Sequence, residues 1–196
     1  MSAELIEQAL TTATDTKAII IGRNVLDRPG ELFKETFPGA RVLVVADENT
    51  YGAAGDPVVA SLKAAGVEFA EEPFVFPGTP TLYGDYDNVS LLREHARPLE
   101  NTVICSIASG TLNDIAKLAS GELERPYMNV CTAASVDGYA SFGAAISRDG
   151  FKITRNCPAP AALVADLDVI AAAPRRLTAT GYGDLIEKIP AGADWI

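Results

Sequence analysis

Residue types that build common functional sites are scarce in this 196-residue chain. It contains one histidine, one tryptophan and three cysteines, and no two cysteines form a Cys-x-x-Cys pair. An odd number of cysteines without such a pair argues against a disulfide framework and against a thiolate zinc site. We therefore expect Cys105, Cys131 and Cys157 to be small buried hydrophobic residues rather than catalytic thiols.

Basic residues and long apolar runs are also in short supply. The chain has 16 Lys and Arg against 26 Asp and Glu, which gives a formal net charge of −10 and a pI near 4.5. This balance argues against nucleic acid or an anionic membrane as a partner, because both need clustered cations. No stretch has the length and apolarity of a transmembrane helix, and the acidic start does not resemble a signal peptide, so we expect a cytoplasmic location.

Short apolar runs alternate with helical patterns along the chain. The expected strands are residues 18–22, 41–46, 67–75, 103–105, 127–130 and 163–165, with a hairpin formed by 144–147 and 151–154. The expected helices are residues 4–10, 29–37, 56–65, 85–96, 111–120, 167–173, 174–180 and 183–189. Continuous apolar strands suit a parallel sheet covered on both faces. The order predicts an α/β fold with a Rossmann-like, doubly wound, mostly parallel sheet.

The stretch 102–120 holds an apolar run, a small-residue turn and a helical pattern in that order. Such a unit points free backbone N–H groups and the positive end of a helix dipole at the space above the turn, where a phosphate can bind. Gly110 would let the backbone approach that phosphate closely. The alternative is that Thr111 and Asp114 only form a capping box.

Asp47 follows an expected strand, and ligands of doubly wound sheets bind beyond the carboxyl ends of strands. Its carboxylate can accept both ribose hydroxyls of an adenosine, which would favour NAD over NADP because a 2′-phosphate would meet a negative charge. Alternatively, Asp47 only begins a loop.

The loop 132–137 follows another expected strand and offers hydroxyls and a carboxylate. Thr132 and Ser135 can hydrogen-bond a ribose or a nicotinamide, or they can be ordinary turn hydroxyls. Asp137 can receive a substrate hydroxyl, or it can form a simple turn with Gly138.

Four segments occur in a characteristic order: ASGTLND at 108–114, TAASVDGYAS at 132–141, GYGDLIEK at 181–188 and DW at 194–195. Together with DENT at 47–50, they resemble the sn-glycerol-1-phosphate dehydrogenase family. The bacterial branch is the most similar, within the larger group of iron-type alcohol dehydrogenases, glycerol dehydrogenases and dehydroquinate synthases. The resemblance runs from about residue 18 to the last residue.

The resemblance implies reversible, NAD(P)-dependent reduction of dihydroxyacetone phosphate to sn-glycerol 1-phosphate, with a zinc or nickel ion polarising the carbonyl group. Asp184 would be the catalytic metal ligand and would contact the substrate, as would Asp137. The implied cofactor-binding residues, together with Asp47, are Ser109, Gly110, Thr111, Asn113, Asp114, Thr132, Ala133, Ala134, Ser135 and Ser141. A homo-oligomer, such as a dimer, is the expected assembly.

Two departures from the family bear on this expectation. Ala108 stands where the family turn begins with glycine, which would crowd the pyrophosphate and lower its affinity. The family metal site resembles one carboxylate with two imidazoles, whereas the chain offers only His95, which we interpret as a surface or helix-end histidine. Asp184 alone will not hold zinc or nickel tightly, and it can instead form an ordinary helix pair with Lys188. We expect no metal-dependent catalysis by these residues alone.

We therefore expect residues 1–166 to form a dinucleotide-binding domain and residues 167–196 to be the truncated beginning of a helical, metal-binding catalytic domain. Two alternatives remain open. One is a glycerol dehydrogenase or a dehydroquinate synthase-like enzyme on the same scaffold. The other is a non-catalytic nucleotide-binding or assembly module, whose bare apolar surface would favour self-association.

Overall fold

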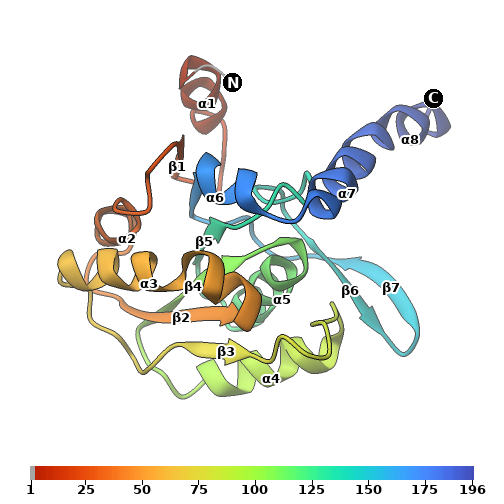
Figure 1. The fold of residues 1–196 in the computed structure, drawn as a ribbon. Helices are drawn as coiled ribbons and strands as arrows, with labels where there is room; N and C mark the ends of the chain where they lie inside the picture. Colours follow the sequence, from red (N-terminus) through yellow and green to blue (C-terminus); the bar gives the residue numbers. More distant parts are fainter. Residues whose placement is uncertain (1–2) are drawn as a thin grey trace.

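The computed structural model describes residues 3–196. Six parallel strands form one sheet in the order β1-β8-β5-β4-β2-β3, with helices on both faces (Figure 1). The strands are β1 (Ala18–Gly22), β2 (Arg41–Asp47), β3 (Phe74–Phe76), β4 (Thr102–Ala108), β5 (Tyr127–Cys131) and β8 (Ala162–Asp166). The expected α/β fold with a doubly wound, mostly parallel sheet is confirmed.

Alternate residues of the central strands enter two separate cores. Along β2, Val42 and Val44 pack into the core beneath α2 and α3, whereas Leu43 and Val45 pack into the core beneath α4 and α5. The bounds of the helices in the first part of the chain are α1 (Ala3–Leu10), α2 (Pro29–Thr36), α3 (Glu48–Ala64), α4 (Tyr86–Ala96) and α5 (Gly110–Glu122). Burial on both faces explains why these strands are continuous apolar runs.

A separate antiparallel hairpin, β6 (Ala144–Arg148) and β7 (Phe151–Arg155), lies over the α4–α5 side of the sheet. The two turn residues, Asp149 and Gly150, both have positive φ angles, as a two-residue hairpin turn of type I′ requires. The predicted hairpin is confirmed.

The helix after β2 begins earlier than the sequence predicts. Asp56 and Pro57 were expected to start it, but α3 begins at Glu48 and contains Pro57 in its interior. Asp47 forms a capping box with Thr50: its Oδ1 accepts the Thr50 amide at 2.9 Å, and the Thr50 hydroxyl accepts the Asp47 amide at 3.0 Å. This cap at the end of the strand starts the helix, and Pro57 removes only one helical hydrogen bond.

Three further helices follow β8: α6 (Leu167–Ala172), α7 (Arg175–Ile186) and α8 (Lys188–Asp194). Their residues are exposed or half-buried, and Figure 1 shows α7 and α8 extending away from the sheet. The single tryptophan, Trp195, is 92% exposed. Their membership of a second domain stays a prediction. Within residues 3–196, no helix combines the length and apolarity needed to cross a membrane.

The expected break between 180 and 183 is wrong, because α7 runs through both Gly181 and Gly183. Gly181 is needed for packing rather than for a turn. A Cβ at this position would overlap the carbonyl oxygen of Ala134, so the missing side chain lets α7 lie directly on the backbone after β5. Gly183 has open space around it.

The surroundings of these two glycines predict that replacing each by alanine has opposite effects on α7. Gly181→Ala should loosen the contact of α7 with Ala134, and trypsin should then cut faster at Arg175 and Arg176. Gly183→Ala should stabilise the same helix by about 0.5–1 kcal/mol, because alanine has the higher helix propensity. Limited proteolysis followed by mass spectrometry measures the rate of cleavage at Arg175 and Arg176 in both variants. Equal cleavage rates in the two variants would contradict the packing role of Gly181.

Candidate nucleotide-binding site

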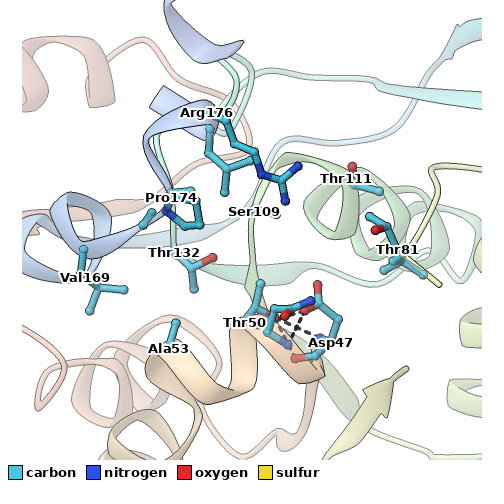
Figure 2. A pocket seen from close by; sticks show the side chains of 16 residues that line it. Asp47, Thr50, Ala53, Thr81, Ser109, Thr111, Thr132, Val169, Pro174 and Arg176 are labelled. Carbon is cyan, nitrogen blue, oxygen red and sulfur yellow. Dashed lines mark hydrogen bonds between the residues drawn. The ribbon is translucent and has the colours of Figure 1, made fainter. Parts of the chain in front are cut away.

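A cleft of about 530 Å³ opens above the carboxyl ends of β2, β4 and β5 (Figure 2). The chain passes from β2 to β3 on one side and then crosses to β4 on the other, so the cleft lies at a topological switch point of the sheet. The lining residues are Asp47, Asn49, Thr50, Ala53, Thr81, Leu82, Ser109, Thr111, Thr132, Ala133, Val169, Ala172, Ala173, Pro174, Arg176 and Leu177. Its volume lies in the range of small-molecule and cofactor sites.

Asp47 lies at one end of this cleft with its carboxylate held in a fixed orientation. Oδ1 accepts the backbone amides of Asn49 at 2.8 Å and of Thr50 at 2.9 Å. The side chain is 8% exposed, and the positive end of the α3 dipole stabilises its charge. Within residues 3–196, Oδ2 accepts no hydrogen bond. The residue therefore starts a helix rather than a loop and still has one oxygen for a ligand.

The start of α5 forms a second part of the cleft wall. Ser109 is the N-cap residue but makes no side-chain cap bond, and Thr111 lies inside the first turn. The alternative capping box of Thr111 and Asp114 is therefore wrong. The helix itself offers no acceptor to the amide of Thr111, an exposed residue that lines the cleft.

Gly110 has a structural role at the start of α5. Its amide donates to the Ser135 hydroxyl at 3.0 Å, and a Cβ would lie 2.6 Å from a methyl group of Val136. The missing side chain thus makes room for the loop after β5, and the role of Gly110 toward a phosphate stays a prediction. Ser135 is almost fully buried and caps α5 from outside the helix, a role that no local pattern could reveal.

The loop after β5 divides between the cleft and a neighbouring cluster. Thr132 and Ala133 line the cleft. Further along, the Asp137 amide donates to Asp184 Oδ2 at 2.9 Å, so the two expected substrate-binding residues lie together. Lys188 Nζ lies 3.6 Å from Asp137 Oδ2. The alternative ion pair between Lys188 and Asp184 does not form.

Several expected cofactor residues do not line the cleft. Asn113 is fully buried, and its Oδ1 accepts the Tyr127 hydroxyl at 3.3 Å. Asp114 accepts the Ala145 amide at 3.2 Å beside the hairpin, and burial raises the pKa of its carboxyl group. Ala134 packs against α7, and Ser141 donates to a carbonyl of its own loop. Their roles toward a cofactor stay predictions.

Arg176, which no pattern in the sequence singled out, reaches from α7 into the cleft toward Ser109 and Thr111 (Figure 2). It is the one Lys or Arg among the lining residues, and it makes no ion pair within the described chain. The available signal was a cation at the start of a helical pattern in an acidic chain. Only the position of α7 shows where that cation points.

The described residues do not supply a metal site. Among residues 3–196, no three His, Cys, Asp or Glu side chains form a group that could hold a metal ion. His95 lies near the end of α4, where Nε2 pairs with Glu71 and the ring packs on Phe74. The three cysteines are buried as expected, and burial raises the pKa of the Cys105 and Cys131 thiols to about 12.

The chain is similar to known proteins over most of its length. The family model described as iron-containing alcohol dehydrogenase matches residues 20–174. Glycerol-1-phosphate dehydrogenase of Halalkalibacterium halodurans is 37% identical over 175 residues, which are 89% of this chain and 43% of that protein. Its namesake from Methanosarcina barkeri is 34% identical over 177 residues, or 90% and 48% of the two chains. The chain thus spans less than half the length of these relatives.

Solved structures show the same fold at lower identity. NADH-dependent butanol dehydrogenase A of Thermotoga maritima gives a TM-score of 0.74 at 21% identity, covering 89% of this chain and 48% of that one. Glycerol dehydrogenase of Schizosaccharomyces pombe gives a TM-score of 0.72 at 23% identity, and the match covers 90% of this chain and 43% of that one.

The cap on α5 predicts unequal effects for two serines. Ser135→Ala should lower the free energy of unfolding by about 1 kcal/mol, because the buried Gly110 amide loses its acceptor. Ser109→Ala should change it by less than about 0.5 kcal/mol, since that hydroxyl makes no cap bond. Urea unfolding followed by circular dichroism measures both. A larger loss for the Ser109 variant would show that the N-cap hydroxyl, not Ser135, stabilises the helix.

Proposed function

Because the chain belongs to the iron-containing alcohol dehydrogenase family, we propose that it is the NAD(P)-binding part of a glycerol-1-phosphate dehydrogenase. The observation that carries the proposal is the cleft at the switch point of the sheet, with Asp47 at one end and the start of α5 beside Arg176 at the other. Relatives that carry the name glycerol-1-phosphate dehydrogenase match about nine tenths of the chain, which supports the choice within the family.

The two ends of the cleft suit the two polar parts of a dinucleotide. The free oxygen of Asp47 would accept a ribose hydroxyl, and its negative charge favours NAD over NADP. The amide of Thr111 and the Arg176 guanidinium, which both line the cleft, would hold the pyrophosphate. Thr132 and Ala133 would then line the path toward the nicotinamide. Ser109 lines the same cleft, and contributions from the other predicted cofactor residues, which do not line it, stay predictions.

The proposed reaction reduces dihydroxyacetone phosphate to sn-glycerol 1-phosphate. When bound, the reduced cofactor supplies the hydride that the carbonyl carbon accepts. Asp137 and Asp184 would contact the substrate, and the hydrogen bond from the Asp137 backbone amide to Asp184 Oδ2 holds the two residues side by side. Zinc or nickel binding needs ligands besides Asp184, and residues 3–196 do not supply them as a group.

A second candidate, which the sequence also leaves open, is a nucleotide-binding module without catalytic activity. A glycerol dehydrogenase or a dehydroquinate synthase-like enzyme would use the same scaffold on another substrate. A homodimeric assembly and a cytoplasmic location stay predictions.

Two measurements separate these possibilities. We expect the 196-residue chain to bind NADH saturably, with quenched or shifted cofactor fluorescence, and not to turn it over. The protein as its source cell makes it should oxidise NADH with dihydroxyacetone phosphate faster than with dihydroxyacetone. A preference for the unphosphorylated ketone would exclude the proposed substrate, and binding without turnover in the source-cell protein would favour the second candidate.

Arg176 provides a sharper test of the cleft itself. Arg176→Gln should weaken NADH binding about tenfold and reduce its dependence on salt, because a charge-assisted contact with phosphate is lost. Arg175→Gln removes the same charge from the neighbouring exposed position, which does not line the cleft, and should change the Kd less than twofold. Adenosine, which has no phosphate, should bind both variants alike. Equal losses of NADH affinity in the two variants would exclude a direct contact.

A further inference from the structure

Lys117 is a lysine buried within the fold, with 1% of its surface exposed. It lies on α5, about two turns beyond the Gly110 end of the helix. Its Nζ donates to three backbone carbonyl oxygens: Gly138 at 3.1 Å, Ser141 at 2.9 Å and Gly143 at 3.2 Å. All three ammonium protons therefore have acceptors, and all of the acceptors belong to one short segment of the loop after β5.

Burying this ammonium group is costly, and the site compensates for the cost mostly with neutral groups. Burial lowers the pKa of Lys117, and the nearby charge of Asp114 opposes that shift. The three carbonyl groups supply most of the polar contacts, so the loop must be folded back on itself to present them together. A residue that only filled space at this position would need no such arrangement, since an apolar side chain avoids the desolvation cost altogether.

The loop that Lys117 holds is the one that carries the candidate site residues. Its first part lines the cleft through Thr132 and is tied to the start of α5 by the bond of Ser135 to Gly110. The segment bound by Lys117 begins directly after Asp137, whose amide donates to Asp184. One helix thus holds the loop at two places, on either side of Asp137.

We propose that Lys117 is a positioning residue, whose three hydrogen bonds fix the loop 132–143 on α5 and hold Asp137 beside Asp184. The inference rests on the proposed function for the site that the loop serves. The contact with the loop itself does not depend on the identity of the ligand.

Hydrogen–deuterium exchange of the 196-residue chain tests the anchor. Lys117→Met keeps much of the side-chain volume but removes every donor, and amides in residues 136–143 should exchange at least tenfold faster than in the wild type. Lys117→Arg keeps a charged donor and should recover part of the protection. Leu62→Ala, which cuts a fully buried side chain on α3, is the control for a general loss of stability and should not single out the loop.

The three variants distinguish the donor role from simple packing. Better protection in the methionine variant than in the arginine variant would show that Lys117 acts by filling space, and equal loop exchange in the methionine and Leu62 variants would also overturn the proposal. Should the methionine variant not fold, Lys117→Gln, which keeps a shorter donor, carries the same comparison with wild type.

NADH titration of the same proteins links the anchor to the site. The methionine variant should bind NADH about fivefold more weakly than the Leu62 control, with the arginine variant between them. A freed loop with unchanged NADH affinity would overturn the positioning role. If the wild-type chain binds no NADH, the proposed function fails, whereas the exchange measurement still decides whether Lys117 anchors the loop.

Discussion

The parallel pairing of β2, β4 and β5 is the constraint on which the whole site depends. In a parallel ladder the carboxyl ends of neighbouring strands meet at one edge, and Ala108 at the end of β4 pairs with Cys131 at the end of β5. The chain turns into a helix or a loop directly after each of these ends. Asp47, Ser109 and Thr132 therefore surround one cleft although they are distant in sequence.

Charge is distributed unevenly around that cleft. The molecule carries a net charge of −10. Even so, the start of α5 presents a partial positive charge to the cleft, and the Arg176 guanidinium presents a full positive charge. The corresponding end of α3 is instead neutralised by the Asp47 carboxylate. One helix start thus holds an anion of the protein itself, and under the proposed function the other would hold an anion of the cofactor.

Much of the fold could be predicted from the sequence because burial on both faces requires continuous apolar strands, and these are visible in a single chain. The hairpin was equally clear, since Asp149 and Gly150 suit a turn with positive φ angles. Helix boundaries were less certain where two local signals compete. Both Asp47 and Asp56 can cap a helix, and only the turn at the end of β2 decides for the first.

By itself, the sequence determined the sheet strands except β3, which spans Phe74–Phe76 and not the expected residues 67–75. It also determined the strand-end position of Asp47 and the helix start near Ser109, because these depend on neighbours along the chain. The tertiary structure decided which partner each group has. The contacts of Ser135 with Gly110 and of Lys117 with the loop after β5 join residues that are more than twenty positions apart. Local patterns hold no information about such contacts, since they form only when α5 and that loop pack together.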